Sequence, residues 1–291
     1  MEVAAFDYNE AFSRNIGWFT PAEQQQLRQA RVAIAGLGGV GGVHLLTLVR
    51  LGIERFRIAD LDRFALVNFN RQAGAACSSI DREKTAVMAA MARDINPELG
   101  LDEFPDGVHA GNVDAFLDGV DVYVDGLDYF VFETRRLVYD ACRRKGIPVV
   151  LAVPLGMGAS LLHFLPEGPD FESYFRLEDG RREEWPVRFL AGVAPALLHR
   201  HYLAYPDIVD FAAQRVPSTG AACQICSGMA ATSVAKILLK RGLIEAVPRS
   251  MQFDAYTGRF KHVWRPGGNR HPLQRLAIAY INYRLRRAGK A

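Results

Sequence analysis

Five glycines fall within the seven residues from Gly36 to Gly42, directly after the short apolar run at 32–35. A turn without side chains allows backbone N–H groups to approach a phosphate, and the helix that follows directs its partial positive charge at the same anion. Because the turn follows a predicted strand and opens a predicted helix, it indicates a nucleotide site, with a tight turn that binds nothing as the alternative. The binding positions that the motif predicts are Gly36, Gly38, Gly39 and Gly41.

Strands and helices alternate along the first half of the chain. Short apolar runs predict buried strands, and apolar residues at helical spacing predict helices. The predicted strands are 32–36, 56–62, 120–128 and 147–156, and the predicted helices are 21–31, 43–52, 81–95 and 130–146. This alternation predicts an α/β fold with a Rossmann-like, doubly wound and mostly parallel sheet and helices on both faces.

The second half of the chain is less regular. Residues 166–187 combine prolines, glycines and charges and predict a long surface excursion. Residues 251–266 predict a hairpin that turns at Thr257 and Gly258, so the sheet is expected to be extended by an antiparallel C-terminal portion. Further helices are predicted at 189–203, 227–242 and 273–290.

The charge balance gives no reason to expect a nucleic-acid or membrane partner. The chain has 35 Lys and Arg residues against 32 Asp and Glu residues, a formal net charge of +3. Its start lacks the basic and apolar segments of a signal peptide, and no apolar run approaches the ~20 residues of a spanning helix. Four scattered cysteines are too few for a disulfide framework. We therefore expect a cytoplasmic protein with no membrane contact and no direct contact to nucleic acid.

The residues after the second predicted strand distinguish between two nucleotides. Asp60 ends that strand about 20 residues beyond the glycines, where a carboxylate accepts hydrogen bonds from a ribose, and Asp62 is assigned to the same site. Such a carboxylate fits an NAD enzyme and an ATP enzyme equally well. An enzyme that breaks the α–β phosphate bond must also neutralise the charge that develops there, whereas hydride transfer has no such need. The polar and cationic residues that follow, and that favour ATP, are Asn68, Arg71, Gln72 and Lys84.

These motifs together resemble the ThiF/MoeB/HesA superfamily, whose adenylating core is shared with ubiquitin-activating enzymes. The resemblance covers residues 14–165 and resumes at 226–265. Its pattern is a glycine-rich turn, an Asp after the second strand, an Asn and then Arg-Gln, a Lys, and an Asp after the next core strand. The matching positions after the glycine turn are Asp60, Asn68, Arg71, Gln72, Lys84 and Asp128. Five elements in order are far more specific than a glycine motif alone.

The resemblance implies an ATP-dependent adenylyltransferase. In this superfamily a carboxylate, usually the C-terminal glycine of a ubiquitin-like protein, attacks the α-phosphate of ATP and yields an acyl-adenylate and pyrophosphate. By matching positions, the glycine turn and Asp60 would hold the adenosine, and Asp128 would hold Mg²⁺. Asn68, Arg71 and Lys84 would grip the phosphates. The catalytic positions implied are Arg14, Arg71, Lys84 and Asp128.

The resemblance also implies partners. Arg14 matches an N-terminal Arg that reaches the ATP of the other subunit of a homodimer, although a solvated arm residue is the alternative. The acyl substrate would be a ubiquitin-like protein, a sulfur-carrier protein or a peptide, with a small acid attached to RNA or to a metabolite as the alternative. The chain would then consist of an N-terminal helical arm at 1–30, an ATP-binding half at 31–165, and a crossover segment with the substrate and dimer half at 166–291.

The sequence departs from the superfamily in its cysteines and at Tyr129. Many relatives hold zinc with two CxxC pairs, but this chain has only Cys223 and Cys226. We therefore expect no zinc site, with a site completed by His199, His201 or His262 as the alternative. At the start of a helix these thiols would have a lowered pKa and would be candidates to accept an acyl group, with buried packing cysteines as the alternative. Tyr129 stands where relatives place Asn after the metal-binding Asp.

Two classes of function fit these observations. The first is the carboxylate-activating adenylyltransferase, which Arg71, Lys84 and Asp128 favour. The alternative is an NAD(P)-linked oxidoreductase or a nucleotide-binding regulatory module on the same fold, because a fold does not fix the chemistry that it supports.

Overall fold

The structure is a computed structural model that describes residues 6–287. The chain divides into two compact units. The first unit runs to Leu127 and takes in Ser227–Ile244, and the second contains Asp128–Cys226 and the residues from Glu245 onward. These boundaries differ from the three spans expected from the sequence, and the roles assigned to those spans remain predictions.

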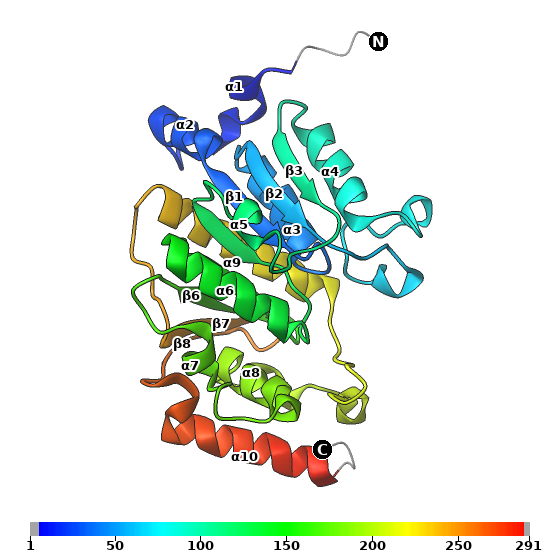
Figure 1. Ribbon diagram of the computed structural model, residues 1–291, viewed down its shortest axis with the longest axis vertical. Coiled ribbons are helices and arrows are strands. Elements are labelled where there is room, and N and C mark those ends of the chain that lie inside the picture. Colours follow the sequence, from blue (N-terminus) through cyan, green and yellow to red (C-terminus); the bar gives the residue numbers. More distant parts are fainter. Residues whose placement is uncertain (1–5, 288–291) are drawn as a thin grey trace. The chain divides into compact units, whose positions relative to one another are not determined.

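Parallel strands form the sheet of the first unit (Figure 1). Their order is β3 (Gly100–Phe104), β2 (Arg55–Ala59), β1 (Arg31–Ala35) and β4 (Val122–Asp125). All of β4 is buried, as is β1 after its first residue, which is typical of parallel strands covered on both faces. The predicted doubly wound α/β architecture is therefore confirmed for this part of the chain.

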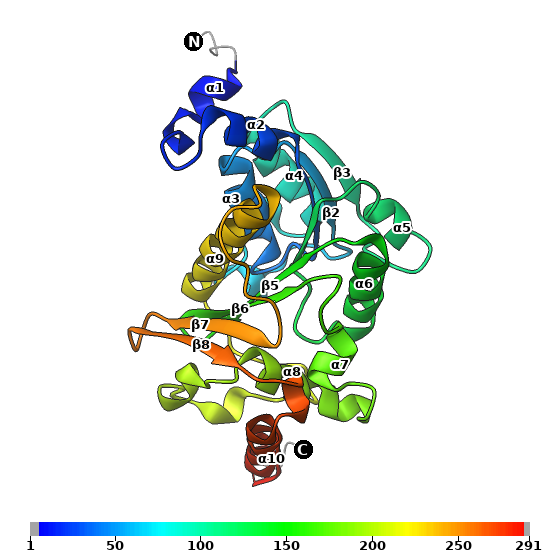
Figure 2. The same cartoon turned by 90° about the vertical axis from the view of Figure 1, so that its left-hand side faces the viewer.

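Helices connect the strands of the first unit and cover its sheet. They are α3 (Gly41–Arg50), α4 (Lys84–Ile95), the short α5 (Val113–Phe116) and, from Ser227 onward, α9 (Gly220–Leu238). The Ser227 hydroxyl donates to the Val43 carbonyl at 3.0 Å and lies 2.8 Å from the Thr47 hydroxyl, so α9 packs on α3. Figure 2 shows these two helices on the same side of the sheet.

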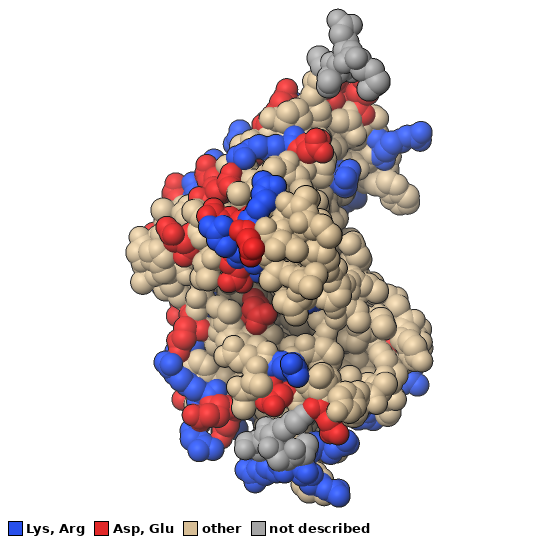
Figure 3. Space-filling model, turned by 90° about the vertical axis from the view of Figure 1, so that its right-hand side faces the viewer, with Lys and Arg blue, Asp and Glu red and all other residues tan. Residues whose placement is uncertain are grey.

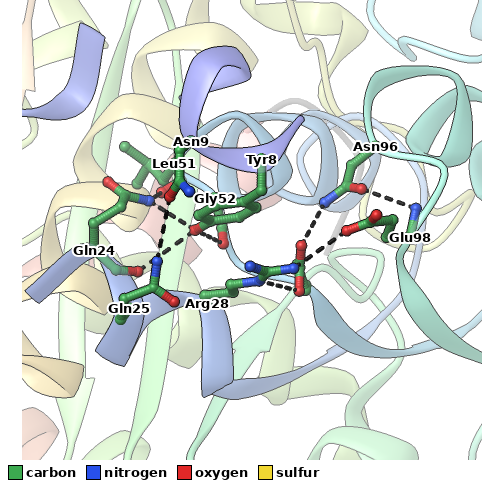
Figure 4. Close-up of polar contacts among 10 residues, drawn as sticks. Tyr8, Asn9, Gln24, Gln25, Arg28, Leu51, Gly52, Asn96 and Glu98 are labelled. Atoms are coloured by element: carbon green, nitrogen blue, oxygen red, sulfur yellow. Dashed lines mark hydrogen bonds and ion pairs between the residues drawn. The ribbon is translucent and has the colours of Figure 1, made fainter. Parts of the chain in front are cut away.

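The N-terminal arm is fixed to the first unit by a polar network. The arm consists of α1 (Tyr8–Ala11), the 3-10 turn η1 (Ser13–Asn15) and α2 (Pro21–Gln29). The buried Tyr8 hydroxyl donates to the Gly52 carbonyl at 2.7 Å and accepts from Gln24 Nε2 at 2.9 Å (Figure 4). Arg28 Nε donates to the Glu54 carboxylate at 2.7 Å. These contacts hold the arm in one place on the first unit.

The second unit contains an antiparallel sheet. Its strands, in order, are β5 (Val149–Leu155), β6 (Gly158–Phe164), β7 (Arg249–Asp254) and β8 (Arg259–Trp264). The predicted hairpin is β7–β8, which confirms the antiparallel C-terminal portion. Its helices are α6 (Phe132–Lys145), α7 (Phe171–Phe175), α8 (Trp185–Val193) and α10 (Pro272–Arg287). Basic side chains gather where α10 ends, and three arginines lie in its last turn (Figure 3).

The prediction of a surface excursion at 166–187 is wrong. Asp170 caps a short helix, α7, by accepting the Ser173 N–H at 2.7 Å. The Phe171 and Phe175 side chains of this helix are buried. Their ring centroids lie 4.9 Å apart, with the ring planes inclined at 56°. Aromatic burial therefore outweighs the polar composition that suggested a loop.

Two helix boundaries also differ from the prediction. α8 ends at Val193 because Pro195 lacks a backbone N–H and disfavours helical geometry in the residue before it, so the helix expected at 189–203 is divided. α9 begins at Gly220 instead of 227 and is, by length and composition alone, apolar enough to cross a membrane. Core helices of soluble proteins meet the same criterion, and half of the apolar window is buried in the protein. The end of the helix predicted at 273–290 lies outside the described residues.

Three glycines pack backbone against backbone where β1 and β4 end. Gly36 has a φ of +84°, a conformation that favours glycine. A Cβ on Gly41, the first residue of α3, would lie 1.7 Å from the Gly36 carbonyl oxygen, and a Cβ on Gly126 would lie 2.2 Å from the same atom. We call this contact the glycine contact. It brings the start of α3 directly onto the ends of the two strands.

We expect Gly41→Ala to lower the free energy of unfolding by ~3 kcal/mol or more, because the new methyl group meets a backbone that cannot move aside. Urea unfolding followed by circular dichroism measures this loss. The matched control is Gly228→Ala in α9, where a Cβ would meet nothing within 4 Å and the change should stabilise the helix by about 0.5–1 kcal/mol. Equal effects of the two substitutions would contradict the importance of the glycine contact.

Candidate nucleotide-binding site

The turn between β1 and α3 presents backbone donors without a side-chain cap. Val40 precedes α3 and makes no capping hydrogen bond, and the first N–H groups of a helix lack intrahelical partners. A Cβ on Gly38 would have only the Gln72 side chain within 4 Å. Gln72 is buried, and its Oε1 has no hydrogen-bond partner among residues 6–287. The Gly42 N–H donates to the Gly38 carbonyl at 3.4 Å, and the other donors at this helix N-terminus are suited to a phosphate or another anion.

Asp60 ties the glycine turn to the end of β2. Its Oδ2 accepts the Leu37 N–H at 2.6 Å, and its Oδ1 accepts the Asp62 N–H at 2.8 Å. Burial raises the pKa of the Asp60 carboxyl, while nearby Lys84 and the two N–H groups oppose that shift. The structure shows that Asp60 fixes the shape of the turn, and the contact to a ribose expected from the sequence stays a prediction.

Lys84 and Asp62 form an ion pair beside this turn. Lys84 begins α4, its side chain is only 7% exposed, and its Nζ lies 2.9 Å from Asp62 Oδ2. The Lys84 N–H also donates to the Asp62 carbonyl at 3.0 Å. Because Asp62 N–H bonds Asp60, a continuous series of hydrogen bonds joins the glycine turn to the Lys84 ammonium. The structure therefore brings the glycines, both aspartates and the lysine together.

Asn68 and Arg71 follow β2 on a short irregular segment and bond to that segment. The buried Asn68 side chain accepts the Ala65 N–H at 2.9 Å, so it stabilises its own 3-10 turn. Arg71 Nη1 donates to the Val67 carbonyl at 3.1 Å and to Asn70 Oδ1 at 2.9 Å. The structure thus shows local partners for both residues, and their contacts to phosphate stay predictions.

Asp128 lies at the start of the second unit, directly after Leu127. It is exposed, and its Oδ1 accepts the Phe130 N–H at 3.2 Å. Carboxylate oxygen is a ligand that Mg²⁺ prefers, and Mg²⁺ is usually bound by one or two carboxylates together with substrate phosphates. Within residues 6–287 there is no group of three or more metal-ligating side chains. A single exposed carboxylate is compatible with an ion held mainly by phosphates, and the role of Asp128 as a magnesium ligand stays a prediction.

Tyr129 has a packing role that the sequence did not reveal. Its hydroxyl donates to the Pro186 carbonyl at 2.6 Å, and its ring stacks on Phe211 with 5.9 Å between the centroids. Burial raises the pKa of this phenol well above its ordinary value. Directly after Asp128 this chain therefore has a side chain that joins α8 to the segment after β4.

Cys223 and Cys226 lie within α9 and are buried. The expectation of a lowered thiol pKa is wrong for Cys226, because burial raises the pKa of its thiol. A thiolate that attacks an acyl group must be accessible and ionised. The structure therefore favours the alternative of packing cysteines, and the acyl-acceptor role remains an untested prediction.

Gly126 and His44 belong to this region and were missed in the sequence. Gly126 directly follows the apolar residues of β4 in the sequence. A glycine at that position is the one signal that could have predicted a close backbone contact there. His44, on α3, is fully buried, and neither ring nitrogen has a hydrogen-bond partner among the described residues. Nothing in the spacing of apolar residues on α3 separated this histidine from a surface one.

Comparison with known proteins gives one family match and two relatives in sequence. A model described as the ThiF family matches residues 12–274. The chain is 31% identical over 144 residues to the tRNA threonylcarbamoyladenosine dehydratase of Haemophilus influenzae, which covers 50% of this chain and 55% of that protein. It is 30% identical over 155 residues to the SAMP-activating enzyme E1 of Haloferax volcanii, which covers 53% of this chain and 57% of that protein.

A likeness to solved structures supports the same fold. MccB of E. coli, solved with ATP, has a TM-score of 0.65 and 18% identity, with 89% of this chain and 72% of that chain covered. Another MccB structure contains MccA. The chain spans only slightly more than half the length of the two sequence relatives, 55% and 57%.

The buried His44 should make folding stability depend on pH. Burial lowers the pKa of His44 to about 3 from an ordinary value of 6.5. Between pH 6.5 and pH 3 the His44 side chain is protonated in the unfolded chain but not in the folded chain. Its contribution to the free energy of unfolding is therefore fully present above pH 6.5 and is lost as the pH falls toward 3. We expect His44 to contribute a slope of up to ~1.4 kcal/mol per pH unit.

Urea unfolding at a series of pH values from ~7 down to ~4 tests this expectation. His44→Leu should remove the slope due to this residue, whereas His201→Leu, at an exposed position, should leave the wild-type dependence unchanged. The same slope in wild type and His44→Leu would show that another group governs acid sensitivity.

Proposed function

The chain belongs to the ThiF family, and on that premise we propose that it is an ATP-dependent adenylyltransferase that activates a carboxylate. The carboxylate oxygen attacks the α-phosphate of ATP, the α–β bond breaks, and the products are an acyl-adenylate and pyrophosphate. The observation that carries the proposal is the series of contacts from the uncapped glycine turn through Asp60 and Asp62 to buried Lys84. This series of contacts links the backbone donors of the glycine turn to the Lys84 ammonium.

The site has to bring two anions together. Backbone N–H groups of the glycine turn and the partial positive charge of α3 attract the triphosphate. Lys84 exchanges the Asp62 carboxylate for a phosphate oxygen, and Arg71 leaves its local carbonyl partner to add a second cation. These charges offset the triphosphate and the incoming carboxylate, which would otherwise repel each other.

The remaining predicted residues hold the nucleotide in this proposal. Asp60 accepts hydrogen bonds from the ribose through the lone pairs that the backbone N–H groups leave free, and the unpartnered Gln72 amide beside Gly38 binds a polar group of the nucleotide. Asn68 orders the segment that carries Arg71. Asp128 would hold Mg²⁺, which supplies charge neutralisation at the phosphates when bound.

We propose a protein or peptide C-terminus as the acyl substrate. Two relatives support this class: one is named as the activating enzyme of SAMP, and MccB was solved with MccA. The substrate would be a ubiquitin-like protein, a sulfur-carrier protein or a peptide in the cytoplasm. An acid on tRNA, suggested by the name of the Haemophilus influenzae relative, is the second source to test.

The alternative of an NAD(P)-linked oxidoreductase is less favoured. Hydride transfer does not require a buried lysine beside the pyrophosphate-binding turn, and Lys84 occupies that place through Asp62. Calorimetric titration separates the two functions, because binding of NAD with no binding of ATP and Mg²⁺ would overturn the proposed function.

Lys84→Met keeps the apolar stem and removes the charge, so we expect pyrophosphate exchange into ATP to fall by ~10²–10³-fold. The assay contains ATP, Mg²⁺ and a small protein ending in Gly-Gly, and circular dichroism confirms that the variant is folded. Lys261→Met is the matched control, because Lys261 is exposed on β8 and should leave exchange unchanged. Full activity of Lys84→Met would remove this lysine from the mechanism.

We further propose that the chain acts as a homodimer in which Arg14 completes the site of the partner. Arg14 is exposed on η1, and its guanidinium makes no hydrogen bond or ion pair within residues 6–287. A 1:1 mixture of Arg14→Ala and Lys84→Met chains, each nearly inactive alone, should recover about one quarter of wild-type activity, because half of the dimers carry one intact shared site. No recovery after subunit exchange would place Arg14 in its own subunit's site or outside both.

A further inference from the structure

Helix α10 packs one of its sides against the second unit. Gln274 is buried, and its Nε2 donates to the Ala191 carbonyl of α8 at 2.6 Å and to Asn269 Oδ1 at 3.4 Å. Residues on the same side of an α-helix follow one another at intervals of three or four. Those that follow Gln274 at such intervals are only partly exposed, and they are Ile278, Ile281 and Leu285. This side of α10 is therefore already occupied within the unit.

The opposite side of α10 is also apolar, but it is open to solvent. Four large apolar side chains there are between 48% and 66% exposed. Single exposed apolar residues are common on protein surfaces, whereas a contiguous row of them marks an interaction site. We call this row the outer stripe, and it consists of Leu273, Leu276, Tyr280 and Tyr283.

The spacing of the outer stripe favours another helix as the partner. Its residues follow one another at intervals of three, four and three, as the a and d positions of a coiled coil do. At about 100° per residue they span only ~80° of the helix circumference. The core-facing side of a globular helix is ~100° wide or more, while a narrower seam is typical of a contact between two helices.

The arginines of α10 flank the outer stripe and have no carboxylate partners. The helix contains no Asp or Glu, and none of its arginines forms an ion pair among the described residues. Arg284 Nη1 donates to the Tyr280 hydroxyl at 3.1 Å, and Arg287 Nη1 donates to the Tyr283 hydroxyl at 3.3 Å. These guanidiniums thus lie along the stripe, and basic side chains gather where the helix ends (Figure 3). The arginines of the helix are Arg275, Arg284, Arg286 and Arg287.

We propose that the outer stripe is the docking site for an acidic amphipathic helix of another protein. Apolar side chains of that helix pack on the leucines and tyrosines, and its flanking Asp or Glu side chains pair with the arginines. The planar guanidinium fork matches the two oxygens of a carboxylate, so arginine suits this role better than lysine. A second copy of this chain does not fit, because two α10 helices side by side set arginines against arginines with no carboxylate between them.

The length of the outer stripe indicates a reversible contact. From Leu273 to Tyr283 the helix rises ~15 Å, which is about three turns. A helix-on-helix contact of this length buries less than ~1,200 Å², the range of weak and transient complexes. Salt screens exposed charges, so the affinity falls as the ionic strength rises.

The inference goes beyond the proposed function and does not rest on it. All residues of the outer stripe belong to the second unit, whereas the glycine turn, Asp60 and Lys84 belong to the first. Loss of pyrophosphate exchange in the wild type would reject the adenylyltransferase and leave the docking site unchanged.

Fluorescence anisotropy of the full chain with a labelled synthetic helix tests the docking site. The probe repeats a heptad with Leu at a and d and Glu at e and g, so that like charges keep it from pairing with itself. We expect this acidic probe to bind, and a basic probe with Lys at e and g to bind at least ~10-fold more weakly. Added salt should weaken binding of the acidic probe.

Substitutions on α10 separate the apolar contribution from the charged one. Leu276→Ala should weaken binding by ~10-fold or more, because a leucine buried in the complex is lost. Its matched control is Leu243→Ala, since Leu243 is 75% exposed and belongs to the first unit. Arg284→Gln should weaken binding by ~3–10-fold and reduce its salt dependence. Its control is Arg50→Gln, since Arg50 is likewise exposed at the end of a helix, α3.

Several results would overturn the inference. If the acidic probe does not bind, or binds no better than the basic probe, the arginines do not select an acidic partner. Wild-type affinity of folded Leu276→Ala chains, with folding checked by circular dichroism, would place the contact elsewhere. Binding of the wild type to phosphatidylglycerol vesicles or to tRNA, without binding of the acidic probe, would assign α10 to a membrane or to RNA instead.

Discussion

The glycine contact is the constraint on which the candidate site depends. Gly36, Gly41 and Gly126 meet at distances that leave no room for any Cβ, so α3 begins directly on the ends of β1 and β4. This closeness leaves the donors at the start of α3 without a side-chain cap, and Asp60 then fixes the turn that presents them. Backbone packing, which carries no side-chain chemistry, therefore sets the geometry of the charged groups around it.

Much of the first unit could be predicted because its signals are local. β1 and β4 are continuous apolar runs, and α6 ends where Gly146 takes a left-handed φ of +72°. β3 could not be predicted, since an edge strand with only Leu101 buried shows little hydrophobic pattern. α7 was not predicted because its aromatic side chains pack on Tyr139, Phe164 and Phe189, which lie outside the segment, and the composition of the segment does not report such contacts.

In the candidate site, too, some residues could be predicted from the sequence while their contacts could not. Spacing and residue type pointed to Lys84 and Asp60, but the sequence could not show that Asp62 pairs with Lys84 or that Asn68 and Arg71 bond to their own segment. These are choices among rotamers that depend on neighbours brought in by folding. The same limit applies to Cys226, which lies within α9 and is buried.

The ion pair of Lys84 with Asp62 has a consequence for selectivity. A buried ammonium with no counterion would attract chloride, sulfate or inorganic phosphate from the cell, whereas here the protein supplies its own competitor for the cation. An incoming anion gains only the difference between its attraction to Lys84 and that of a carboxylate held 2.9 Å away. Small monovalent ions gain little from this exchange, while a polyphosphate that also engages the helix N-terminus gains much more. In the proposed site the Lys84–Asp62 pair would therefore favour binding of highly charged ligands over that of the abundant singly charged anions.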